Sequence, residues 1–159
     1  MRRHVYFYTH VDDSYADLAA VLAGDPSAWL PAPARPSGDG WLVDLQSLRG
    51  LPGAMAAHTA LVTVGEPSIA SGSATLLRAV AWRSAAAEPF VPVLEGDLEL
   101  ASLGGYGCHL SVMGSYRPPL SVAGEAGDRL FGHRIAEACV RRFVLDIADR
   151  LATSAALPA

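Results

Sequence analysis

The sequence predicts an α+β domain in which a curved, six-stranded antiparallel sheet wraps around one long C-terminal helix, with two short helices after the first strand. Three observations lead to this fold class. The chain has 159 residues, which is enough for one domain with a sizeable core. Most of segment 41–117 alternates between apolar and polar residues, the period of a half-buried strand. The one long helical pattern, residues 130–151, comes last in the chain.

The final helical pattern is amphipathic and contains no proline. Glu137 and Asp146 stand four residues before Arg141 and Arg150, a pairing that stabilises an exposed helix face. A single helix after a run of strands must lay its apolar side on the sheet that those strands form. The residues predicted to make this contact are Ala136, Cys139, Val140, Phe143, Val144, Ile147 and Leu151.

The elements before this helix are separated by turn residues. Residues 3–11 alternate and predict the first strand. Asp12, Asp13 and Ser14 then offer N-cap side chains for a short helix that ends at Gly24. A second short helical turn carries Trp29. Strands are expected at 41–48, 57–65, 73–84, 88–103 and 108–117. We expect a single domain over residues 1–153 and a frayed tail over 154–159.

Composition excludes several classes of function. The net charge is −4 and there is no basic stripe, which argues against a nucleic-acid partner. No apolar run is long enough to span a membrane, and none follows the basic start as in a signal peptide. The five histidines and the two cysteines lack metal or redox spacing. We therefore expect a soluble cytoplasmic protein with two buried thiols, no metal and no cofactor.

The order of the elements, strand, two short helices, five-strand meander and final helix, resembles the SRPBCC or helix-grip superfamily. Val11-Asp-Asp-Ser14 leads into the first helix and Ser115-Tyr-Arg-Pro-Pro119 leads into the last, as in that superfamily. It includes START lipid-transfer domains, the birch-pollen-allergen family and polyketide cyclases. The resemblance covers almost the whole chain and is one of topology, since the superfamily has no invariant catalytic motif. It implies a hydrophobic cavity between the sheet and the last helix.

A physical argument also supports a cavity. A strongly curved sheet cannot lie flush along a straight helix, so large side chains or a ligand must fill the gap. We expect a mostly apolar cavity of about 300–1,000 Å³. It would bind a small hydrophobic molecule such as a lipid, an isoprenoid or a polyketide. The alternative is that the same side chains fill the space and form an ordinary core without a cavity. The candidate apolar lining residues are Trp29, Trp41, Val43, Leu98, Leu100, Leu110, Val112, Ile135, Cys139 and Phe143.

Two polar residues are candidates for contact with a ligand. Arg78 would face the cavity if Trp82 does, and could then bind a carboxylate or enolate. If Ala79 faces inward instead, Arg78 points outward toward the acidic residues 95–99. We favour the outward orientation, because the acidic residues need partners and the alanine leaves space. Tyr116 could hydrogen-bond a ligand oxygen, or could simply place its hydroxyl at the edge of the core.

Two other functions are alternatives to ligand binding alone. An enzyme of the polyketide cyclase or dehydratase kind would need a general acid or base in the cavity, for which Arg78 and Tyr116 are the candidates. A protein-interaction module, including a possible homodimer, would use the outer face of the sheet. There the first strand presents an alternating row of aromatic and histidine side chains, namely His4, Tyr6, Tyr8 and His10.

Overall fold

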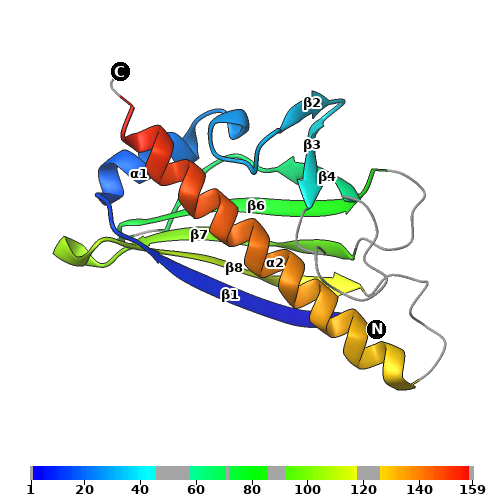
Figure 1. Cartoon of the computed structure of the whole chain (residues 1–159). Helices are drawn as coiled ribbons and strands as arrows, with labels where there is room; N and C mark the ends of the chain where they lie inside the picture. Colours follow the sequence, from blue (N-terminus) through cyan, green and yellow to red (C-terminus); the bar gives the residue numbers. More distant parts are fainter. Residues whose placement is uncertain (1, 46–57, 71, 86–91, 118–125, 158–159) are drawn as a thin grey trace.

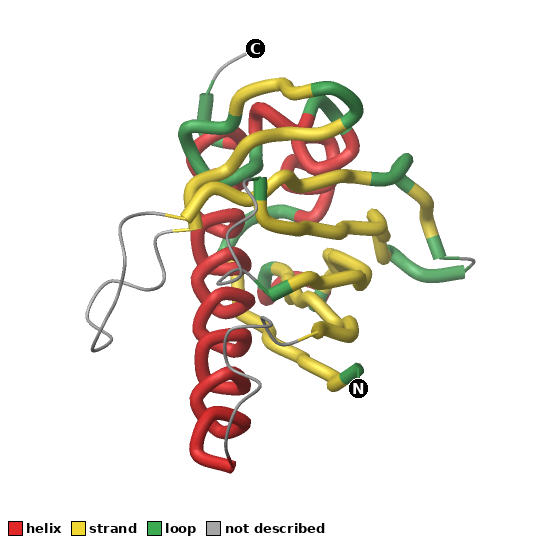
Figure 2. Tube along the Cα trace, turned by 90° about the vertical axis from the view of Figure 1, so that its right-hand side faces the viewer, coloured by secondary structure: helices red, strands yellow, loops and turns green. Residues whose placement is uncertain are grey.

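The fold class that the sequence predicts is confirmed. A computed structural model describes residues 2–45, 58–70, 72–85, 92–117 and 126–157, with the backbone alone at residues 58 and 126–132. A curved antiparallel sheet carries the long helix α2 (Ala126–Ala155) diagonally across one face (Figure 1). Figure 2 shows the same helix running along one side of the strands. We call the face under α2 the inner face.

The sheet has eight strands, two more than the six predicted. The two additional strands, β2 (Arg35–Ser37) and β5 (Ser68–Ile69), are short and lie in segments expected to be turns. The other strands are β1 (Arg3–Val11), β3 (Gly40–Leu45), β4 (His58–Val64), β6 (Thr75–Ser84), β7 (Val93–Ser102) and β8 (Cys108–Arg117). The strand order is β1-β8-β7-β6-β4-β3-β2, and β5 pairs with β6. Residues 46–48 and 88–91 of the predicted strands lie outside the described residues.

The two short elements after β1 begin at side-chain caps. The hydroxyl of Ser14 accepts a hydrogen bond from the backbone N–H of Asp17 at 3.2 Å, which starts α1 (Tyr15–Ala23). The second predicted helix is a single 3-10 turn, η1 (Pro26–Ala28), capped by Asp25. A second 3-10 turn, η3 (Gly104–Tyr106), joins β7 to β8. Both described α-helices therefore lie on the inner face, where Leu18 and Leu22 of α1 join the core.

The orientation of α2 is the one predicted. Ala136, Cys139, Val140, Phe143 and Ile147 are buried. The predicted exposed side chains of Arg134, Arg141 and Asp149 are exposed. The helix continues to Ala155, two residues into the segment predicted to fray. No helix among the described residues is long and apolar enough to cross a membrane.

The ion pairs on α2 are not those predicted. Asp146 pairs with Arg142, one turn before it, at 2.9 Å, and not with Arg150. The guanidinium of Arg150 instead donates to the backbone carbonyl of Ser27 at 2.9 Å. Contact with η1 thus replaces the exposed i,i+4 pair that the sequence suggested.

Two glycines in neighbouring strands allow the sheet to bend. Gly96 of β7 faces Gly114 of β8, in the inner-face row between Val5 and Val80. A Cβ atom at Gly96 would lie 2.6 Å from the carbonyl oxygen of Met113, so a side chain there would clash with backbone. Glycines in strand interiors mark such close approaches and sharp bends. The bend curves the strands around α2.

The prediction that Arg78 points outward is wrong. Its side chain is 6% exposed and lies on the inner face with Trp82, while Ala79 is exposed on the opposite face. The guanidinium donates to the carbonyls of Leu22 at 2.9 Å and Gly24 at 2.8 Å. It also donates to Gly65 at 2.9 Å.

These contacts explain why Arg78 faces inward. The last carbonyls of a helix lack intrahelical donors, and burial without a partner is costly. The guanidinium supplies donors to the carbonyls at the end of α1 and lies over the ring of Trp29, with 5.4 Å to its centroid. This need for donors outweighs the attraction of the acidic residues on the outer face.

Candidate functional site

The residues predicted to line a cavity gather on the inner face and on α2. All but Trp41 are buried, and Trp41 is partly buried against the same core. Register places Val112 opposite Leu98 and Leu110 opposite Leu100. The apolar side chains therefore form one contiguous core between sheet and helix, and their role toward a ligand stays a prediction.

A polar network lies at one end of this core. Tyr116, next to the last residue of β8, is 1% exposed, and its hydroxyl is hydrogen-bonded to Nδ1 of His133 on α2. The two rings are stacked, with centroids 6.0 Å apart. One helical turn later, Oε1 of Glu137 lies 3.0 Å from Nε2 of His133. The side chains of His133 and Glu137 are 37% and 55% exposed, so the network leads from the core to solvent.

The geometry constrains where the protons of this network lie. When the Tyr116 hydroxyl donates to Nδ1, the neutral imidazole of His133 carries its proton on Nε2. That N–H then donates to the Glu137 carboxylate, which fixes the tautomer and the orientation of the ring. A chain of this kind can pass a proton between a buried phenol and the surface.

Arg3 is a further member of the network. It lies directly opposite Tyr116 in the register of β1 and β8. Burial raises the pKa of the Tyr116 phenol, and the hydrogen bond and charge of Arg3 oppose that rise. Because the pKa stays above its ordinary value, Tyr116 keeps its proton at neutral pH and can donate it to an oxygen acceptor.

The same end of the inner face carries a second buried donor. Register aligns Tyr116 with Leu94 of β7 and Leu94 with Trp82 of β6. The ring of Trp82 packs edge-on against Phe143 of α2, with centroids 4.8 Å apart. Its indole Nε1 is buried and has no hydrogen-bond partner among the residues that the structure describes. A buried donor without an acceptor is uncommon and marks a place where an acceptor could bind.

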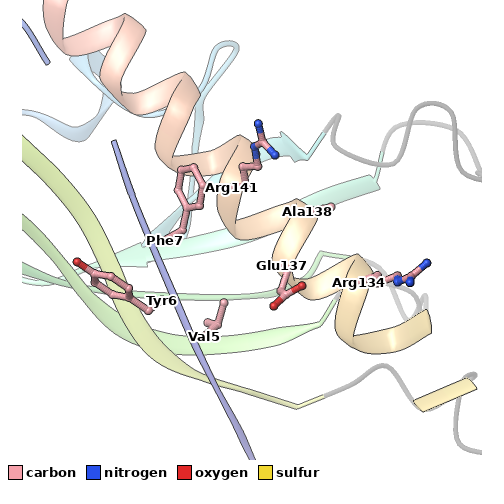
Figure 3. Close-up of a pocket in the computed structure, with 7 residues that line it drawn as sticks. All are labelled: Val5, Tyr6, Phe7, Arg134, Glu137, Ala138 and Arg141. Carbon is pink, nitrogen blue, oxygen red and sulfur yellow. The ribbon is translucent and has the colours of Figure 1, made fainter. Parts of the chain in front are cut away.

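A groove opens beside the network, between β1 and α2. It has a volume of about 360 Å³, and Glu137 and Ala138 of α2 form part of its wall. Figure 3 shows Glu137 between the helix and the strand, on the side of Val5. Arg141 lies over the ring of Phe7, 5.9 Å from its centroid, instead of pairing with Glu137 as predicted. The carboxylate that ends the polar network thus lies in the wall of a groove.

Comparisons with known proteins find the same fold in solved structures. The Zhui aromatase/cyclase from a Streptomyces species matches with a TM-score of 0.57 and 18% identity, over 98% of this chain and 94% of that one. A conserved protein from Geobacillus kaustophilus matches with a TM-score of 0.56 and 17% identity, over 97% of both chains. Truncated norcoclaurine synthase from Thalictrum flavum matches with a TM-score of 0.55 and 12% identity, over 100% and 96%.

This chain has the helix-grip fold of these solved structures. Identities this low establish the fold alone. No protein-family model matches the sequence, and no curated protein matches it. The solved structures therefore confirm the order of strands and helices that the sequence predicts, whereas the sequence comparisons find no match.

Within the helix-grip fold, other hollows lie away from the apolar core. One of about 200 Å³ lies beside the second half of α2, between Asp44 and Arg150. Another, of about 540 Å³, lies on the outer face of the sheet, around Met113. These two hollows and the groove at Glu137 all differ from the apolar cavity predicted between the sheet and the helix. That cavity therefore stays a prediction.

The described part of the fold contains no cluster of three metal-binding side chains. Cys108 and Cys139 are both buried, as predicted, and form no disulfide. Burial, with a smaller effect of the nearby Asp13 carboxylate, raises the pKa of the Cys108 thiol. Cys108 therefore lacks the low pKa of a reactive thiol, and neither cysteine has the exposure of one.

Sequence analysis identified Tyr116 but missed its partners. His133 was weighed only as a metal ligand, and Glu137 was assigned to Arg141. The signal was present in the spacing, because His133 and Glu137 stand four residues apart on one helix face. What the sequence could not provide was the position of that face over the end of β8.

Proposed function

We propose that this protein binds a small, largely apolar molecule between the sheet and α2, with an oxygen of that molecule at the Tyr116 hydroxyl. The observation that carries this proposal is the buried phenol at the end of an apolar core, held by His133 and not by a backbone carbonyl. A side chain whose partner is another titratable side chain can exchange that partner for a ligand. The apolar surroundings favour a lipid, isoprenoid or polyketide-like molecule.

The spacing of donors supports an aromatic, oxygen-bearing ligand over a plain hydrocarbon. Tyr116 and Trp82 lie on strands separated by β7, which puts their backbones about 10 Å apart at the usual strand spacing. A molecule of two or three fused rings spans such a distance. Its oxygens would find the Tyr116 hydroxyl at one end and the unpaired Trp82 N–H at the other. The packed rings of Phe143 and Trp82 would offer aromatic surface to flat rings.

Acid–base catalysis on such a ligand is the second candidate function. The specific observation in its favour is the connection of Tyr116 through His133 to Glu137. In this scheme His133 first takes a proton from solvent and becomes an imidazolium whose Nδ1–H donates to the Tyr116 oxygen. The Tyr116 hydroxyl then gives its proton to a ligand oxygen and takes the Nδ1 proton, which leaves His133 neutral with its proton on Nε2. Glu137 stabilises the imidazole and orients it. Two proteins that share the fold are named aromatase/cyclase and norcoclaurine synthase, which is compatible with this scheme.

The test is a thermal-shift titration with three probes: a hydroxylated anthraquinone, a fatty acid and a plain polycyclic hydrocarbon. A molecule that binds the folded state alone raises the unfolding temperature, and at a given concentration the tighter binder raises it more. Tyr116→Phe should weaken binding of the anthraquinone by roughly tenfold and leave the hydrocarbon unaffected, as expected for one lost buried hydrogen bond. The matched control is Tyr106→Phe, because Tyr106 is 82% exposed.

Two outcomes separate the candidates. One outcome is that the wild type turns over a precursor of such an anthraquinone, whereas His133→Gln still binds the precursor but no longer turns it over. That outcome would establish acid–base catalysis. Stabilisation that is identical in wild type and Tyr116→Phe would contradict the proposed place of the oxygen. If no probe stabilises the wild type, the binding proposal itself is wrong.

A further inference from the structure

The outer face of the sheet, opposite α2, contains a hollow that the proposed function does not use. It has a volume of about 540 Å³, which is in the range of small-molecule sites. Four strands, β1, β6, β7 and β8, contribute to it. Its lining residues are Tyr6, Leu77, Asp97, Glu99, Ser111 and Met113.

The register of the strands explains why this face is hollowed. Two adjacent cross-strand rows meet here, and each contains one small side chain among larger ones. The first row is Tyr6, Met113, Asp97 and Ala79, and the second is Tyr8, Ser111, Glu99 and Leu77. Because neighbouring side chains on one face lie about 5 Å apart, the small residues leave space between the large ones.

One wall of the hollow is apolar and open to solvent. Tyr6 is 55% exposed and Met113 is 63% exposed. Tyr6 also contacts Tyr8, with ring centroids 5.9 Å apart, so the aromatic surface is continuous along β1. A ligand that covers large exposed apolar side chains around a hollow is stabilised there, because it removes their surface from water.

The other wall carries uncompensated negative charge. Asp97 and Glu99 form no ion pair with any described residue, whereas Glu95 on the same strand pairs with Arg2 at 3.1 Å. Neither row contains a basic side chain. Two carboxylates beside an aromatic surface attract a cation, which can also approach the face of the Tyr6 ring.

A serine hydroxyl provides a third kind of contact. Ser111 is 4% exposed and lies in the wall between the aromatic and acidic sides. Its hydroxyl has no hydrogen-bond partner in the described part of the chain, and its oxygen is not fully buried. It can therefore accept a hydrogen bond from a molecule in the hollow.

From these three features we infer that the hollow is a binding site for a small organic cation, namely a primary amine attached to an aromatic ring. The ring lies against Tyr6 and Met113. The ammonium group lies between the carboxylates of Asp97 and Glu99 and donates a hydrogen bond to the Ser111 hydroxyl. A neutral molecule of the same shape lacks the charge that the acidic wall selects.

The experiment is a titration of the full chain, labelled at methionine methyl groups, followed by NMR. Met113 lies in the hollow, and its resonance is assigned with Met113→Leu. Phenethylamine should shift this resonance saturably, and phenethyl alcohol, which has the same shape without the charge, should not. The double variant Asp97→Asn/Glu99→Gln should weaken amine binding by roughly tenfold, the effect of losing two solvent-accessible charge contacts.

A control on the same strand separates specific contact from general negative charge. Glu95→Gln removes one carboxylate outside the hollow and should change the affinity by less than about twofold. Ser111→Ala should weaken binding of the amine and leave the fold unchanged. Equal shifts by amine and alcohol, or an equal loss in Glu95→Gln and in the double variant, would overturn the inference. So would a Met113 resonance that does not move.

Discussion

Arg78 and Tyr116 are both buried polar side chains on the inner face of the sheet, but they contact different kinds of partner. Arg78 donates to three backbone carbonyls, those of Gly65, Leu22 and Gly24. Tyr116 is bonded to the imidazole of His133, which continues to the exposed carboxylate of Glu137. The first set of partners is fixed by the backbone, whereas the second consists of side chains that can rotate and exchange partners.

The difference separates a structural residue from a functional candidate. A guanidinium that donates three of its five N–H groups to carbonyls of the fold is held in place by the backbone, and its burial joins α1 to the sheet. A phenol whose partners are side chains, His133 and Arg3, keeps an oxygen lone pair and a proton that a ligand can compete for. Both residues were ligand candidates in the sequence, and only the identity of the partners distinguishes them.

The largest expected effect tests the structural side of the comparison. Arg78→Met keeps the apolar stem and leaves three carbonyls without their donor. Since each unsatisfied buried group costs about 1–3 kcal/mol, the free energy of unfolding should fall by about 4–5 kcal/mol. Urea denaturation measures this loss. Arg83→Met, at an exposed position on the same strand, should change stability by less than about 0.5 kcal/mol.

A small loss in Arg78→Met would reverse the assignment. It would mean that the carbonyls find other donors and that Arg78 is available for a ligand. Arg78→Lys distinguishes charge from geometry, because an ammonium group cannot reproduce the planar fork that reaches three acceptors. It should recover only part of the stability.

The second prediction asks whether the core beside Tyr116 is as closely packed as the core near α1. Phe143 is 1% exposed and lies against Trp82, so Phe143→Ala should cost about 3–4 kcal/mol of unfolding free energy. Leu151, fully buried on the same helix face, is the comparison. A cost below about 2 kcal/mol for Phe143→Ala, with a normal cost for Leu151→Ala, would indicate open space beside Trp82.

The fold could be predicted from the sequence to a large extent. Residues 3–11 form β1 with the bounds that the alternation predicts, and Ser14, one of the three candidate caps, caps α1. The helical period gave the buried face of α2 correctly, including Phe143 and Ile147. These features depend on local periodicity and capping. The short strand β2 did not follow from periodicity, because three residues are too few to show a period.

The candidate site could be predicted only in part. Alternation placed Tyr116 with the inward-facing residues of its strand, but alternation has two phases, and for Arg78 we chose the wrong one. That choice depended on the carbonyls of α1, which lie more than fifty residues away in the sequence. The link between His133 and Tyr116 likewise depends on where α2 crosses β8. Tertiary contacts of this kind leave no local pattern.

The third prediction measures the bond between Tyr116 and His133. In a double-mutant cycle, Tyr116→Phe and His133→Gln should be coupled by about 1 kcal/mol of unfolding free energy, the net value of a buried hydrogen bond. His133→Gln and Glu137→Gln should be coupled by less than about 0.5 kcal/mol, because that contact is exposed to solvent. Zero coupling between Tyr116 and His133 would remove the first link of the polar network.

The smallest effect concerns stability at alkaline pH. Burial raises the pKa of Tyr116 above its ordinary value of 10.0, against the opposing effect of Arg3. The unfolded chain therefore loses this phenol proton first as the pH rises through about 10. Unfolding then releases a proton, so this contribution to stability is complete below pH 10 and is lost as the pH passes the folded pKa.

The alkaline slope should therefore differ between wild type and Tyr116→Phe. A single group contributes at most about 1.4 kcal/mol per pH unit, and Tyr116→Phe should show a shallower loss by up to that amount above pH 10. The pKa of Cys108, raised from 9.0, adds a slope that begins one unit lower and is shared by both proteins. Tyr106→Phe, which removes a phenol that is 82% exposed, should keep the wild-type slope.

Equal slopes in wild type and Tyr116→Phe would mean that the phenol gives up its proton as easily in the folded protein as in the unfolded chain. Tyr116 could then no longer be contrasted with Arg78 as a buried group that keeps its proton for a ligand.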